Sequence, residues 1–170
     1  MKKLLSLVLC LLMVTFVGTA LAETAETADS IESAYEGVWV TFEDAPSIYL
    51  PADWLELEVT EELAATGLFY VAASPDGAYT CQLYWSALEE NLEVEGLLAV
   101  MQTLYPSSQL IELNGAAFVC FADAEADVLG FAALDAVEPG MYQFIFTPAS
   151  DETLQAYASV IVASMVEGEE

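Results

Sequence analysis

After Ala22 the chain contains no lysine, arginine or histidine, yet all 28 of its aspartate and glutamate residues lie there. No salt bridge between side chains can therefore form in this part of the chain. Burying an ionised carboxylate without a cation is very costly, because the interior does not replace its hydration. We expect nearly all of these carboxylates to face water, accept hydrogen bonds, be protonated or bind an external cation.

The same absence of cations excludes several classes of function. Nucleic-acid binding needs basic side chains that displace the counterions of phosphate, and anionic lipid surfaces repel an acidic chain. Histidine-based triads, lysine Schiff bases and arginine phosphate clamps lack their residues. The expected partner is therefore a basic protein, or a surface bridged to the chain by cations.

The first 22 residues have the three parts of a secretory signal peptide. A basic head precedes an apolar run over residues 4–17, and Ala20 and Ala22 supply the small side chains of a cleavage site. We expect cleavage after Ala22 and a secreted or extracytoplasmic protein that is not held in a membrane. The alternative is that the segment is retained as an anchor, for which its apolar run is short.

The rest of the chain is expected to form one folded domain between two acidic ends. Residues 23–36 are small, polar and acidic, and they predict a flexible leader. Residues 37–166 have the length and patterning of a single α+β domain, and residues 167–170 form an acidic tail.

Hydrophobic patterning predicts strands in two groups, each followed by a long helix. Residues 55–59 alternate apolar and acidic, as in a half-buried strand, and Asn114-Gly115 is a strong hairpin turn. Helical spacing of apolar residues predicts helices over 94–105 and 154–165. Further strands are expected at 38–42, 47–50, 68–73, 78–85, 109–113, 116–121, 128–133 and 141–146. This order predicts an α+β fold with a mostly antiparallel sheet and flanking helices.

Two segments carry a family resemblance. Residues 45–54 read APSIYLPADW, a strand followed by Leu-Pro, a short gap and Trp, and residues 142–148 read YQFIFTP before the last helix. With the order of elements between them, they resemble the Mog1/PsbP-like families, which include exported bacterial members of unknown function. The resemblance covers roughly residues 37–166. It implies an αβα sandwich and partner-binding roles, and it carries over no catalytic residue.

Cys81 and Cys120 are the cysteines that remain after Ala22, and both lie in the middle of an expected strand. An exported protein is able to form a disulfide, and such a bridge would require Cα atoms within about 7 Å. The same positions suit two separate free thiols in the core. The sequence leaves both alternatives open.

Asp123, Glu125 and Asp127 place carboxylates at i, i+2 and i+4, so that in an extended segment they share one face. Such a face is one way to hold Ca²⁺, and calcium is the only cofactor that the sequence suggests. The glycine and distal glutamate of an EF-hand loop are missing, since Val128 and Leu134 occupy those positions. A solvated turn between two strands is the simpler interpretation.

Carboxylate-pair catalysis, as in glycosidases, is the one enzyme class that the composition permits. Asp53 beside Trp54, together with Tyr84 and Trp85, suggests an aromatic sugar platform. The alternative is that these aromatic residues belong to the core, where large rings usually pack.

The sequence as a whole favours an exported, non-catalytic acidic domain that binds a basic or cation-bridged partner. A Ca²⁺-dependent binding domain that uses residues 123–127 is the first alternative, and a carboxylate-based carbohydrate-active enzyme is the second.

Overall fold

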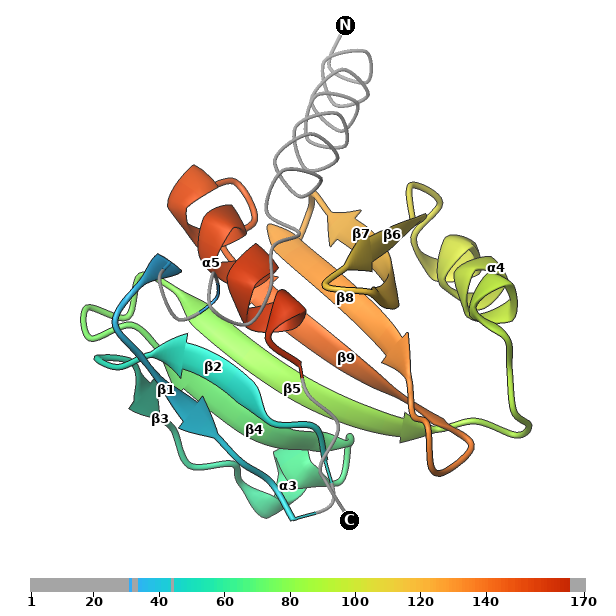
Figure 1. Ribbon diagram of the computed structural model, residues 1–170, viewed down its shortest axis with the longest axis horizontal. Coiled ribbons are helices and arrows are strands. Elements are labelled where there is room, and N and C mark those ends of the chain that lie inside the picture. The colour runs from blue at the N-terminus through green and yellow to red at the C-terminus, as the bar shows by residue number, and fades with distance from the viewer. Residues whose placement is uncertain (1–30, 32–33, 44, 166–170) are drawn as a thin grey trace, which may run out of the picture.

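A computed structural model describes residues 31, 34–43 and 45–165, so the expected signal peptide and acidic tail lie outside the described residues. Figure 1 shows the arrangement of the elements. In chain order they are β1 (Gly37–Val40), β2 (Ile48–Pro51), β3 (Leu55–Glu56), α3 (Glu61–Ala64), β4 (Leu68–Ala73), β5 (Thr80–Ala87), α4 (Val94–Leu104), β6 (Gln109–Leu113), β7 (Ala116–Asp123), β8 (Val128–Leu134), β9 (Gly140–Thr147) and α5 (Glu152–Ala163).

Most strands belong to one large antiparallel sheet, and β1 and β2 form a separate antiparallel pair. The order in the large sheet is β3-β4-β5-β9-β8-β7-β6. The strands β3, β4 and β5 follow one another in the chain and in the sheet. The helix α4 then connects β5 to β6 at the other edge, and β7, β8 and β9 follow inward until β9 pairs with β5. This sheet-dominated architecture confirms the predicted α+β class.

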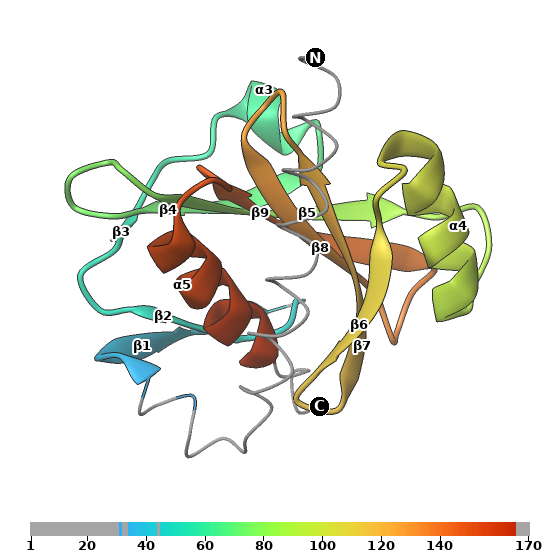
Figure 2. The ribbon, with the colours of Figure 1, turned by 90° about the horizontal axis from the view of Figure 1, so that it is seen from above.

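Different elements cover the two faces of the large sheet (Figure 2). The helix α5 and the β1–β2 pair lie over one face, and their core includes Phe131, Phe144 and Phe146. The helix α4 packs on β7 at the other face, where it buries Leu97 and Met101. We call these two hydrophobic clusters the α5 core and the α4 core.

Local sequence signals account for how α5 and the β6–β7 hairpin form. The Asp151 side chain accepts hydrogen bonds from the backbone N–H groups of Thr153 and Leu154, which caps the start of α5. Asn114 and Gly115 have φ angles of 51° and 81°, as the predicted two-residue turn requires. No helix among the residues described here is long and apolar enough to cross a membrane.

The structure departs from the sequence expectation for residues 55–59. The strand expected over residues 55–59 is limited to β3, and Leu55 and Leu57 are 57% and 44% exposed rather than half-buried. This strand lies at the edge of the sheet, where a second partner is lacking among the described strands. Within the expected leader, Ile31 is buried and Tyr35 packs against the domain.

Candidate functional site

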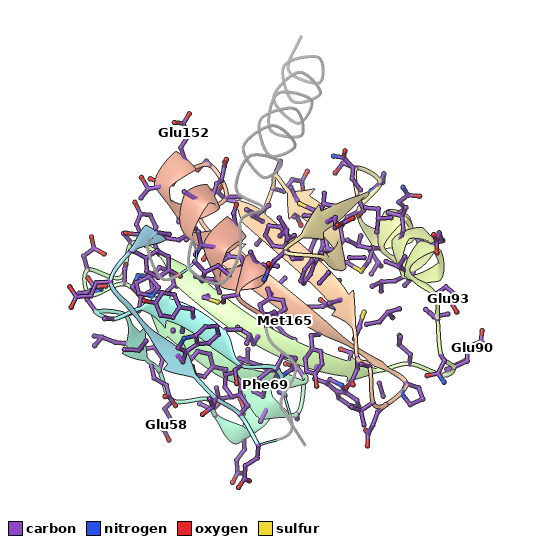
Figure 3. The ribbon with its side chains drawn as sticks, viewed as in Figure 1. Glu58, Phe69, Glu90, Glu93, Glu152 and Met165 are labelled. Carbon is purple, nitrogen blue, oxygen red and sulfur yellow. The ribbon has the colours of Figure 1, made fainter. Side chains whose placement is uncertain are left out.

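The carboxylates of the described residues are all exposed or half-buried, and the buried polar side chains there are serines. Four adjacent strands, β4, β5, β9 and β8, contain no acidic residue. Figure 3 shows Glu58, Glu90, Glu93 and Glu152 pointing away from the body of the domain. The negative charge therefore lies mainly on turns, edges and helix starts, as expected for carboxylates that have no basic partner.

An aromatic cluster forms where α5 meets the β1–β2 pair. Its rings come from β1, β2, the segments that flank this pair, the turn before β5, and α5, so residues far apart in sequence meet here. The members of this aromatic cluster are Tyr35, Trp39, Tyr49, Trp54, Tyr79 and Tyr157.

Tyr157 of α5 is the centre of the cluster. The ring centroids of Tyr35, Trp54 and Tyr79 lie 5.4, 5.9 and 6.3 Å from that of Tyr157, each in an edge-to-face arrangement. Such pairs contribute about 0.5–1.5 kcal/mol each beyond the burial of their area. The cluster therefore helps to hold the N-terminal segments against α5.

Tyr35 and Tyr49 form the rigid base of the cluster. Their rings stack at 5.4 Å, and the Tyr35 hydroxyl donates to the Tyr49 carbonyl at 2.7 Å. The Gly37 N–H donates to the Tyr49 hydroxyl at 3.0 Å, and a Cβ at Gly37 would lie only 2.6 Å from the Tyr49 ring. Burial raises the pKa of Tyr35 well above its ordinary value, so this phenol stays neutral.

All rings of the cluster except that of Tyr49 keep contact with solvent, and Tyr35 is half-buried. Trp39 is 40% exposed, and Trp54, Tyr79 and Tyr157 are half-buried. Trp39 lies against Tyr49 with a centroid distance of 5.4 Å. The cluster thus presents partly exposed aromatic surface around the buried Tyr49 ring.

Carboxylates adjoin these rings. Asp151 accepts a hydrogen bond from the Tyr79 hydroxyl at 3.3 Å while it caps α5, and the backbone N–H of Leu154 is the main cause that lowers the pKa of this carboxyl group. Exposed Glu36 and Asp53 directly neighbour Tyr35 and Trp54 in the chain. Aromatic faces and carboxylates both attract cations, so the arrangement suits a positively charged group.

Two of the three carboxylates expected to bind Ca²⁺, Asp123 and Asp127, accept hydrogen bonds from groups of the chain itself. Asp123 accepts hydrogen bonds from the N–H groups of Glu125 and Ala126 at 2.9 and 3.1 Å, so it shapes its own turn. Asp127 accepts instead from the N–H and hydroxyl of Ser150 at 2.8 and 2.9 Å. In the part of the chain that the structure describes, no three His, Cys, Asp or Glu side chains gather to hold a metal ion.

Cys81 and Cys120 are separate buried thiols in this structure, which is the second of the two expected alternatives. Cys81 lies on β5 and Cys120 on β7, with β9 and β8 between them. At about 4.8 Å per strand, three steps separate the Cα atoms by about 14 Å across the sheet, beyond the limit of about 7 Å for a bridge. Burial raises the pKa of both thiols, to about 12 for Cys120.

The expected sugar platform is not assembled either. Trp54, next to Asp53, packs on Tyr157, whereas the Trp85 indole N–H donates to Asp135 at 2.9 Å. Trp54 and Tyr79 both contact Tyr157, and Tyr79 directly precedes β5. Trp85 follows Tyr79 by six residues, which corresponds to about 20 Å in an extended strand. Trp54 therefore lies toward the start of β5, whereas Tyr84 and Trp85 lie toward its end.

The sequence analysis placed the members of the aromatic cluster in the leader, in strands, in a turn and in one helix, but it did not bring them together. Tyr35 was assigned to the leader, and Tyr157 to the apolar face of the last helix. No local spacing relates these residues, because they meet only when α5 packs on β2. The density of aromatic residues at the start of the domain was the only signal.

The fold and its surface define the class of the protein as an α+β domain with a PsbP-like fold. The solution structure of cyanobacterial PsbP from Synechocystis sp. PCC 6803 superposes with a TM-score of 0.52 at 12% identity, covering 75% of this chain and 90% of that one. A protein from Bacteroides thetaiotaomicron superposes with a TM-score of 0.51 at 13% identity. The match covers 74% of this chain and 46% of the Bacteroides protein.

No family model and no curated protein matches the sequence. At these low identities the two solved structures establish the fold alone. The predicted resemblance to PsbP-like proteins is thereby confirmed for the fold.

Proposed function

We propose that this chain is an exported, non-catalytic domain that binds a basic protein partner. The observation that carries the proposal is the aromatic cluster, which opens to solvent beside carboxylates that have no cation of their own. An interface with aromatic residues at its centre and polar groups at its rim is typical of protein–protein contacts. Here the rim is acidic, so the complementary rim is basic.

Three carboxyl groups, Asp76, Asp135 and Asp151, have lowered pKa values and do not suit the role of a catalytic acid. A glycosidase needs one carboxyl group with a raised pKa as its acid. Hydrogen bonds lower the pKa of Asp76, chiefly one from Ser74, and the pKa of Asp151, chiefly one from Leu154. For Asp135, burial acts to raise the pKa, but the hydrogen bonds that it accepts outweigh burial and lower it.

Export is part of the proposal because residues 1–22 have the pattern of a signal peptide. Expression of the full chain in a secreting bacterium tests this part. N-terminal sequencing of the protein from the medium is expected to begin at Glu23, whereas a retained, membrane-bound chain would contradict it.

Binding is tested by immobilising the chain from Glu23 onward and exposing it to the secreted proteins of its own source. We expect retention of a basic protein at low salt, with affinity that falls at least about tenfold between about 0.05 and 0.5 M NaCl, because salt screens exposed charges. The retained protein is then purified, and its affinity is measured separately. Absence of a retained basic protein at low salt, or retention that salt leaves unchanged, would contradict the proposal.

Matched charge variants locate the contact. The triple variant Glu36→Gln, Asp53→Asn, Asp151→Asn removes three charges beside the aromatic cluster, and asparagine still caps a helix. The control Glu89→Gln, Glu90→Gln, Glu93→Gln removes three charges before α4, toward the opposite end of the domain. The first set is expected to weaken binding more than the second. Equal effects would show that only total charge matters.

A further inference from the structure

We propose that the aromatic cluster binds the cationic head of an arginine or lysine side chain of the partner protein. This inference rests on the proposed function and names the chemical group that its site recognises. The faces of Trp and Tyr rings carry partial negative charge, and a cation within about 6 Å of a ring centroid is attracted to it. Trp39, Trp54, Tyr79 and Tyr157 retain solvent-accessible surface in the cluster.

The charges around the rings favour the same occupant. Asp151 contacts the Tyr79 hydroxyl at 3.3 Å, and its lowered pKa keeps it ionised at neutral pH. Glu36 and Asp53 are exposed next to cluster rings in the chain. A cation bound against the Tyr79 ring would therefore lie close to the Asp151 carboxylate, which adds to the aromatic attraction.

The described structure argues against other occupants. A second copy of the chain carries no lysine, arginine or histidine after Ala22, so it would bring only further carboxylates to the site. A bound metal ion lacks a set of three ligands among the described side chains. A neutral ligand would gain hydrogen bonds from the carboxylates but no attraction between opposite charges. A basic side chain uses both the rings and the charges.

Arginine- and citrulline-containing peptides test the inference, because citrulline has nearly the shape of arginine without its charge. The probes are Ac-Gly-Arg-Gly-Arg-Gly-NH₂ and the same peptide with citrulline in place of arginine. Binding is followed by NMR of the tryptophan and tyrosine ring resonances in the chain from Glu23 onward. We expect the arginine peptide to bind about tenfold more tightly and to shift the resonances of Trp54, Tyr79 and Tyr157.

Ring variants assign the effect to the cluster. Trp54→Leu and Tyr79→Leu are each expected to weaken arginine-peptide binding about two- to thirtyfold, the range of a cation–π contact. Trp54→Phe keeps a ring and is expected to lose less. Tyr84→Leu is the matched control, since Tyr84 is equally half-buried but its hydroxyl bonds to Gln82, away from the cluster.

The outcomes separate this inference from the proposed function. If the wild-type chain prefers arginine in a salt-dependent manner, but Trp54→Leu and Tyr79→Leu bind as the wild type does, the aromatic site is wrong and the basic-partner proposal stands. If arginine and citrulline peptides bind equally, both are overturned. If a leucine variant fails to fold, the wild type and the Trp54→Phe variant still test the aromatic site. Ring resonances of the cluster that do not shift when the arginine peptide is added would overturn it.

Discussion

Ser164 joins α5 to β2 through one buried hydroxyl group. Its Oγ accepts the Tyr49 N–H at 2.7 Å and donates to the Ile161 carbonyl at 2.6 Å. We expect Ser164→Ala to lower the free energy of unfolding by about 1–3 kcal/mol, because it leaves the buried Tyr49 N–H without an acceptor. Urea unfolding measures this change.

Ser159→Ala is the control for that prediction. The Ser159 hydroxyl is half-buried on the same helix and only donates back to the Gln155 carbonyl at 2.8 Å. Its removal is expected to change stability by less than about 0.5 kcal/mol. Equal losses for the two variants would mean that the link from α5 to β2 contributes nothing specific.

Asp135 is expected to titrate below 3.8, the ordinary value for an aspartate. Burial favours its neutral form, but hydrogen bonds from the Val137 N–H, the Trp85 indole and the Glu138 N–H outweigh burial and lower the pKa. Because the folded pKa lies below the unfolded one, the stability from this group is present above the unfolded value and is lost as pH falls through the folded value.

The Trp85 indole N–H resonance in NMR spectra checks this titration directly. Its chemical shift should change with a midpoint below 3.8, and Asp135→Asn should abolish that change. A midpoint above 3.8 in the wild type would show that burial outweighs the local hydrogen bonds at this residue.

At the scale of elements, Gly130 allows β7 and β8 to pack under α4. A Cβ at Gly130 would overlap the ring of Phe121, which stacks on Tyr105 at 4.5 Å just after α4. Gly130→Ala is therefore expected to destabilise the domain by about 1–3 kcal/mol or more. Denaturant unfolding in the Phe121→Leu background tests the cause, because the smaller side chain leaves room and the alanine should then cost less. An unchanged cost there would exclude the clash.

The strand order makes a prediction about the two thiols. Cys81 and Cys120 lie on strands separated by two others, and burial keeps both neutral. Ellman's reagent should therefore react with neither thiol in the native domain and with both after unfolding without reductant. Absence of reaction in denaturant would show a bridge, which would require a different strand order from the one observed.

Most elements were predictable from local patterns, and their exceptions have tertiary causes. The Asn114-Gly115 turn and the apolar spacing of α5 appear as expected, because each depends on neighbours in sequence. The alternation at residues 55–59 predicted a half-buried strand, but β3 spans only Leu55–Glu56, and Leu57 adds one hydrogen bond to Val71 of β4. An alternating apolar and polar pattern indicates which residues share a face of a strand. It does not indicate whether another layer of the protein covers that face.

At the scale of the whole molecule, uncompensated charge should make stability depend on salt. The carboxylates of the described residues lie at the surface without basic partners, and salt screens repulsion over the Debye length of about 10 Å at 0.1 M. Raising NaCl from about 0.01 to 0.5 M should increase the melting temperature, by about 4 °C for each 1 kcal/mol of repulsion removed. Choline chloride should act similarly if screening is the cause, whereas a flat melting temperature would contradict it.

The sequence by itself determined where charge is tolerated, because a chain without cations after Ala22 cannot compensate a buried carboxylate. It also determined most strands and helices, since periodicity and turn chemistry act between near neighbours. Only the tertiary structure decided that the two cysteines stay apart, that residues 123–127 form a turn, and that the aromatic cluster exists. These outcomes depend on strand order and on contacts such as that of Tyr49 with Ser164, 115 residues apart. No local pattern encodes such contacts, because they arise only when distant segments share one core.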